Sequence, residues 1–299
     1  MNLRYFFELI ALASLWGASF LFMRVAVPEF GPIWLIAWRV FLAGLLLLPV
    51  LIHQGLLADL HKHAKPLLIV GLFNSALPFL GFAYATTILT GGFTSILNAT
   101  VPLFGVLLVL IGFNQEKLSP AQIGGFVLGF TGVGILLGWH TSTPNSYFWL
   151  AVLASLTAAL LYAISATYIK RRLVGVSSVV IAVGSQLAAT LVFIPLLPFS
   201  MPAALPSLKA MLALVALAVF STALAYLMYF RLIRMVGAAR AVTVTYMIPL
   251  FAMIWGTLVL HEPITWDMMV GCAVILTGTA LANGVFTKWT KNLALLIER

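Results

Sequence analysis

Residues 32–52 have the sequence PIWLIAWRVFLAGLLLLPVLI, in which Arg39 is the only charged side chain. A helix of this length rises about 30 Å, which matches the hydrocarbon thickness of a bilayer. The whole chain has the same character, because 63% of its 299 residues are hydrophobic and 8% are charged. A water-soluble surface needs roughly 25% charged residues. Lipid therefore surrounds most of this chain, and the backbone must form helices to satisfy its own hydrogen bonds.

Similar apolar runs recur along the chain and predict an all-α membrane protein with ten transmembrane helices. Turn-forming pairs such as Gly-Pro, Gly-Gly and Ser-Pro separate most of the runs. The predicted spans cover residues 6–27, 32–52, 66–87, 93–112, 120–139, 147–169, 176–198, 208–230, 240–260 and 265–286.

The basic residues predict the orientation of these spans. With a cytoplasmic N-terminus, thirteen Lys and Arg lie on the cytoplasmic side, and two, Arg24 and Lys209, lie on the other side. Topology and anionic lipid heads therefore explain the net charge of +9, and we expect no nucleic-acid partner. We expect a bacterial-type inner membrane with both termini in the cytoplasm. The tail at 287–299 has an apolar face, which suits an amphipathic helix on the cytoplasmic leaflet or a frayed end.

An internal repeat divides the chain into two halves, related by a shift of 146 to 147 residues. Pro102-Leu103-Phe104 matches Pro249-Leu250-Phe251, and Glu116 matches Glu262. Each half holds five predicted spans, so the second copy must enter the membrane the other way up. We predict a first repeat over 1–142 and an inverted second repeat over 143–286, around a central cavity. Such inverted repeats are typical of secondary transporters that work by alternating access.

Several motifs resemble the drug/metabolite transporter superfamily, specifically two EamA-type domains. The motifs are Trp16-Gly17-Ala18-Ser19-Phe20, Arg39, Asn98-Ala99-Thr100-Val101-Pro102-Leu103, Glu116 with Gly124, Tyr246-Met247-Ile248-Pro249-Leu250, and His261-Glu262-Pro263 with Gly271. The resemblance implies a helical basket whose cavity is lined by the first, third, fourth, sixth, eighth and ninth helices. It also implies export of a small metabolite, such as an amino acid or a similar amphipathic compound, as in related bacterial exporters. We expect no cofactor.

Polar and aromatic residues of those six helices predict a neutral cavity. Hydrogen bonds would orient a zwitterionic or amphipathic substrate, and aromatic faces would hold its apolar groups or an ammonium. Each residue taken alone is better explained by hydrogen bonding between helices. The candidate substrate-binding residues are Trp16, Ser19, Asn74, Ser75, Thr94, Asn98, Tyr162, Ser165, Ser221, Thr222, Tyr226, Thr245 and Tyr246.

Charged residues inside the spans are few. Arg39 either attracts a substrate carboxylate or locks helices through backbone carbonyls, and the peripheral place of the second helix in the family favours the structural role. Glu8 is the candidate for ion coupling, or it is a carboxylate that reaches the membrane interface. No carboxylate or histidine lies in mid-span, which argues against a metal-ion carrier and against a buried proton relay.

Backbone breakers and small residues point to moving and packing positions. Pro78, Pro102 and Pro249 lie inside spans, and the last two occupy equivalent repeat positions, so we expect them to shape or hinge two gates. Residues 125–129 and 134–138 each form a G-x-x-x-G motif. Such motifs permit close packing within the chain or between the protomers of a homodimer, and both arrangements stay open.

Other functions are less consistent with the residues. A sugar-phosphate exchanger needs several Lys or Arg in the cavity, and Arg39 is the single candidate; a lipid or drug transporter of the same fold stays an alternative. An integral membrane enzyme needs a positioned nucleophile, base or metal set. The chain has no H-E-x-x-H, no paired mid-membrane aspartates and no G-x-S-x-G. We therefore predict a carrier and name no catalytic or metal-binding residue.

Overall fold

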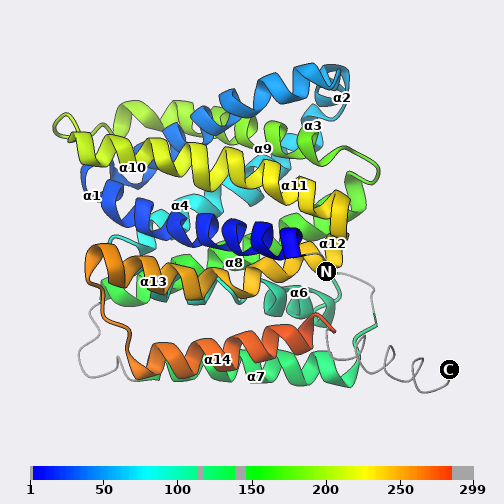
Figure 1. Cartoon of the computed structure of the whole chain (residues 1–299), viewed down its shortest axis with the longest axis vertical. Helices are drawn as coiled ribbons and strands as arrows, with labels where there is room; N and C mark the ends of the chain where they lie inside the picture. Colours follow the sequence, from blue (N-terminus) through cyan, green and yellow to red (C-terminus); the bar gives the residue numbers. More distant parts are fainter. Residues whose placement is uncertain (1–2, 114–116, 139–145, 285–299) are drawn as a thin grey trace.

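The computed structural model describes residues 3–113, 117–138 and 146–284, and its long helices lie roughly side by side (Figure 1). The described residues form helices and turns without a β-strand, which confirms the predicted all-helical class. The elements are α1 (Leu3–His53), α2 (Leu57–Lys62), α3 (Ala64–Val70), η1 (Gly71–Ala76), α4 (Leu77–Ala85), α5 (Gly91–Asn98), α6 (Val101–Leu110), α7 (Pro120–Gly138), α8 (Ser146–Arg172), α9 (Ser178–Phe193), η3 (Ile194–Phe199), α10 (Leu208–Ala218), η4 (Val219–Leu224), α11 (Ala225–Val236), α12 (Ala238–Ala241), η5 (Val242–Tyr246), α13 (Ile248–Leu260) and α14 (Trp266–Ala282).

Seven helical segments of the described chain are long and apolar enough to cross a membrane, and α13 and α14 are shorter apolar helices. The first of the seven, α1, would measure about 75 Å if it were straight. It is broken at Gly31, where φ is 69° and ψ is 158°. A side chain would strain this positive φ, and glycine adopts it freely. Two apolar helices therefore meet at Gly31. The predicted tail at 287–299 lies outside the described residues.

The helices are interrupted at two places that correspond in the two halves, once by a π-helix and once by the start of a new α-helix. The π-helices η1 and η4 lie 148 residues apart, and α6 and α13 start 147 residues apart. Pro102 and Pro249 each lie in the first turn of their helix. Backbone N–H groups in a first turn have no partner within the helix, so proline loses no hydrogen bond there. Pro78 likewise stands in the first turn of α4, directly after η1. The three prolines therefore begin helices, and the break in each span precedes the proline.

The helices α7 and α14 pack closely along one edge of the molecule (Figure 1). A Cβ atom built on Gly125 would lie 2.6 Å from the backbone nitrogen of Ala282, and one built on Gly278 would lie 2.4 Å from that of Gly129. The first predicted G-x-x-x-G motif is thus an internal contact. Gly134, from the second motif, has no atom within 4 Å of such a Cβ and is exposed. A homodimer contact through the second motif stays a prediction.

Glu29, which lies in α1 just before the break at Gly31, supports the N-terminal cap of α10. The Ser207 hydroxyl accepts a hydrogen bond from the Ala210 N–H, and Glu29 accepts hydrogen bonds from both the N–H and the hydroxyl of Ser207. The bond from the Ser207 backbone, followed by the bond from its hydroxyl, holds the pKa of the exposed Glu29 carboxyl below its ordinary value. The ionised carboxylate is therefore the form that the fold favours.

This lowered pKa predicts a pH-dependent contribution to stability. Ionised Glu29 stabilises the fold fully above the ordinary carboxyl pKa, and the stabilisation is lost as the pH falls through the lowered value. We expect Glu29→Gln to lower the melting temperature of the detergent-solubilised protein slightly at pH 7. In acid the melting temperatures of variant and wild type should converge. A difference that persists or grows on acidification would contradict this assignment.

Candidate functional site

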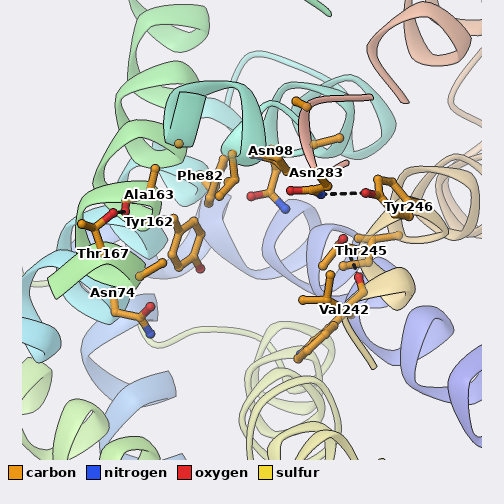
Figure 2. Close-up of a pocket in the computed structure, with 18 of the residues that line it drawn as sticks. Asn74, Phe82, Asn98, Tyr162, Ala163, Thr167, Val242, Thr245, Tyr246 and Asn283 are labelled. Atoms are coloured by element: carbon orange, nitrogen blue, oxygen red, sulfur yellow. Dashed lines mark hydrogen bonds between the residues drawn. The ribbon is translucent and has the colours of Figure 1, made fainter. Parts of the chain in front are cut away.

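Residues from both halves of the chain line a cavity of about 660 Å³. Its size is in the range of small-molecule binding sites. Helix α1 and the segments η1, α4, α5 and α6 supply side chains from the first half, and α8, η4, α11 and η5 supply them from the second. Figure 2 shows Asn74, Tyr162 and Thr167 on one side of the cavity and Thr245 and Tyr246 on the other. Residues of both halves of the chain therefore line the cavity, and the division into two repeats stays a prediction.

Most of the predicted cavity residues lie together in its walls. Ten of the thirteen candidates line the cavity: Trp16, Ser19, Asn74, Asn98, Tyr162, Ser221, Thr222, Tyr226, Thr245 and Tyr246. They come from both halves of the chain, with Asn74 in η1 and Tyr226 in α11. Whether these residues bind a substrate stays a prediction.

The other three candidates are buried outside the cavity lining. Ser75 accepts a hydrogen bond of 3.1 Å from the Gln186 amide of α9, and Thr94 donates one of 2.9 Å to the Thr90 carbonyl. Ser165 is also buried, and its hydroxyl has no partner among the described residues. Ser75 thus takes part in the bonding between helices that the sequence offered as the alternative, whereas the Thr94 bond stays within the first turn of α5.

The sequence missed part of the lining. The apolar side chains of Met23, Phe79 and Phe82 line the inner part of the cavity, and such residues cannot be told from ordinary core residues by type. Gln122 and Asn283 come from α7 and from the residue after α14, two spans outside the six that the resemblance implied. The amide of Gln122 donates to the Ala282 carbonyl, and that of Asn283 donates to the Tyr246 hydroxyl (Figure 2).

Arg39 also lines the cavity, although the resemblance placed its helix at the periphery. Its side chain is 4% exposed. Nε donates to the Thr222 hydroxyl at 3.1 Å, Nη1 approaches the Met23 sulfur at 3.8 Å, and the guanidinium carbon lies 3.7 Å from the centre of the Phe79 ring. No described carboxylate forms an ion pair with it, and its hydrogen bonds reach no backbone carbonyl. The geometry therefore does not support the predicted lock through carbonyls.

An ion-paired cluster outside the cavity lining joins three parts of the chain. Arg24 Nε lies 3.2 Å from Glu262 Oε1, and Arg24 Nη1 donates to the Thr86 carbonyl at 2.7 Å. The second oxygen of Glu262 accepts the Gly91 N–H at 3.0 Å. We call these four residues the Arg24–Glu262 cluster. It joins α1, the α4–α5 connection and the α13–α14 connection, while its counterpart in the repeat, Glu116, lies outside the described residues.

Phe20 separates the cavity from this cluster. Its side chain lines the cavity, while its Cβ lies 3.4 Å from the position that a Cβ on Gly91 would take. Its ring packs edge-on against Phe82, with 5.9 Å between centroids. The apolar packing of Phe20 thus lies next to the residues of the Arg24–Glu262 cluster.

Glu8 lies away from the cavity lining. Its carboxylate is 3.4 Å from Arg4 Nε and 3.3 Å from Arg231 Nη2. Two arginines thus hold the carboxylate that the sequence offered for ion coupling, at the start of α1 and the end part of α11. A coupling role for Glu8 stays a prediction.

The EamA-like transporter family matches this chain twice, over residues 5–138 and 149–284. The uncharacterized transporter YvbV of Bacillus subtilis is 27% identical over 91% of this chain and 89% of its own length. The uncharacterized inner membrane transporter YedA of Escherichia coli K12 is 29% identical, over 84% of this chain and 81% of its own. One crystal structure has the same fold, with a TM-score of 0.65 and 20% identity over 94% of this chain and 97% of that one.

Proposed function

The chain belongs to the EamA-like transporter family, and from this premise we propose that it is a secondary carrier of small metabolites in a bacterial-type inner membrane. The observation that carries the proposal is the cavity lined by both halves of the chain. It reaches the helix ends at Gln122, Lys170 and Asn283, while the Arg24–Glu262 ion pair lies at the opposite ends of the spans. A carrier needs such a site, because it must expose the same residues to one side at a time.

The proposal includes ten spans arranged as two inverted repeats. Counting the broken helix α1 twice and adding α13 and α14 gives ten apolar segments in the described chain. Each family match covers one half, and five segments per half require opposite insertion. The recurrence of η1 as η4, and of the α6 start as the α13 start, supports equivalent halves. These paired irregularities are consistent with the broken helices that line transporter cavities.

The orientation of the chain supports an inward-open state. Lys170, Gln122 and Asn283 line the cavity near helix ends that the Lys and Arg distribution assigns to the cytoplasm. The Arg24–Glu262 cluster then seals the outer end. Alternating access requires this cluster to separate while the cytoplasmic mouth closes. The paired breaks before Pro102 and Pro249 are the candidate hinges for that change.

The proposed substrates are amino acids or similar amphipathic metabolites, moved outward. The cavity combines hydroxyl and amide groups with aromatic faces, and such a lining holds a small molecule that has polar and apolar parts. Proteoliposome counterflow with labelled amino acids and amphipathic drugs, with and without a proton gradient, tests both substrate and mechanism. The absence of saturable counterflow of any compound by folded protein would defeat the proposal.

A single substitution can test whether the substrate passes through the cavity. Gly105 lines the cavity, and a Cβ at this position would meet no atom within 4 Å. We expect Gly105→Phe to fill part of the cavity without disturbing helix packing, and to reduce counterflow by more than about tenfold. Gly134→Phe is the matched control, because Gly134 is equally unobstructed but faces away from the cavity. Equal counterflow by the two variants would exclude this route.

A further inference from the structure

We propose that Arg39 is the anion-binding centre of the cavity and that the transported molecules carry one carboxylate, which this guanidinium binds. The inference rests on the proposed carrier function and names its substrate class. It starts from the placement of a buried cation in the wall of a cavity, eight residues beyond the break at Gly31. That spacing corresponds to a depth of about 12 Å along the helix.

No carboxylate among the described residues compensates the charge of Arg39. Arginine stays protonated in proteins, and a cation in a membrane-embedded bundle is costly unless it is paired. Its contacts with described residues are the Thr222 hydroxyl, the Met23 sulfur and one face of the Phe79 ring. None of these is an anion, and Nη2 has no hydrogen-bond partner among the described residues. A bound anion would supply both the missing charge and the missing acceptor.

The surroundings of Arg39 favour an anion over a cation. The charged side chains in the described lining are Arg39 and Lys170, both basic, and the lining contains no Asp or Glu. A cavity with low-dielectric walls and charges of one sign raises the local concentration of ions of the opposite sign. Tyr162 and Tyr226 also line the cavity. Their hydroxyls are neutral groups that can bind the polar remainder of a ligand, such as an ammonium or a hydroxyl.

One guanidinium fits a carboxylate better than a phosphate. The planar fork of arginine matches the two oxygens of a carboxylate and carries one compensating charge. A phosphate ester carries close to two charges, and the inner part of the cavity offers a single cation. The aromatic rings of Trp16, Phe79 and Phe82 provide an apolar surface beside this site. The expected ligands are therefore monocarboxylates and zwitterions with an apolar side group.

Binding to the full-length chain in detergent tests this inference without requiring transport. The probes are acetate, butyrate, 3-phenylpropionate and phenylalanine, each compared with its uncharged or cationic amide at constant ionic strength. We expect 3-phenylpropionate to bind wild type saturably, by calorimetry and by an increase in melting temperature, at least about tenfold more tightly than its amide. Arg39→Met should remove this preference, and Arg39→Lys should retain part of it. Lys209→Met, which removes an exposed positive charge, should bind as wild type does.

Each result decides the inference. Equal binding of acid and amide by wild type, an unchanged preference in Arg39→Met, or no binding of any carboxylate in the series would overturn it. If Arg39→Met does not fold, the comparison of acid with amide in wild type still decides. Selective carboxylate binding without counterflow would defeat the carrier proposal alone. Counterflow of compounds whose acids and amides bind equally would defeat the role of Arg39 alone.

Discussion

Gly278→Ala is expected to abolish most of the folded protein. The added Cβ would lie 2.4 Å from the backbone nitrogen of Gly129 and 2.5 Å from its Cα. No side-chain rotation relieves a clash with backbone, so α14 must move away from α7 along their whole contact. Overpacking of one methyl group typically costs about 1–3 kcal/mol, and a clash between two backbones lies at or above the top of that range. We expect loss of the monodisperse peak in size-exclusion chromatography and a much lower melting temperature.

Gly134→Ala is the matched control for this prediction. Both substitutions replace glycine by alanine inside a helix of the α7–α14 pair, but a Cβ on Gly134 meets no neighbour within 4 Å. Alanine is favoured over glycine in a helix interior by about 1 kcal/mol. The melting temperature should therefore stay the same or rise. Similar losses in both variants would show that glycine is needed for a reason other than the approach of the two helices.

Glu262→Gln is expected to open the outer end of the protein. The change leaves Arg24 without its ion pair, although the amide oxygen can still accept the Gly91 N–H. The Glu262 side chain is 11% exposed and that of Arg24 is 31% exposed, so water compensates only partly. A hydrogen bond to a charged group contributes about 1.5–3 kcal/mol. Its loss should change the ratio of outward-open to inward-open protein by roughly 10- to 100-fold.

The opening can be measured by labelling Ser19→Cys in intact cells with a membrane-impermeant thiol reagent. Ser19 lines the cavity, and the native Cys272 is buried. We expect slow labelling from outside with an intact Arg24–Glu262 cluster and fast labelling when Glu262→Gln is added. Arg24→Gln should have at least the same effect, because it also removes the bond to the Thr86 carbonyl. The double variant should add little to Arg24→Gln, because both single changes remove the same ion pair.

Glu29→Gln is the control for the labelling experiment. Glu29 is another carboxylate at this end of the bundle, but its hydrogen bonds go to Ser207 and not to Arg24. It should leave the labelling rate of Ser19→Cys unchanged. Unchanged labelling in Glu262→Gln as well would mean that the cluster does not hold the outer end closed.

Two neighbouring residues, Asn74 and Ser75, show which part of the cavity lining could be predicted from the sequence. Both were predicted to line the cavity, but Asn74 does so and Ser75 is bonded to Gln186 on α9. Successive residues on a helix point about 100° apart, so the rotation of the helix decides which one faces the cavity. Both residues lie in the π-helix η1, whose wider turn shifts that rotation. Apolar periodicity carries no signal for such a turn.

The sequence by itself determined the solvent, the helical class and the family. Apolar runs such as 32–52 favour lipid over water as their surroundings. A backbone in lipid must satisfy its hydrogen bonds within each segment, so local composition is sufficient to predict helices. The tertiary structure alone decided that Gly125 packs on α14 while Gly134 does not, that Arg39 faces a cavity, and that Arg24 meets Glu262 across 238 residues. These are properties of pairs of helices. Their physical cause is the rotation and approach of each helix against its neighbours, which small side chains permit but do not specify.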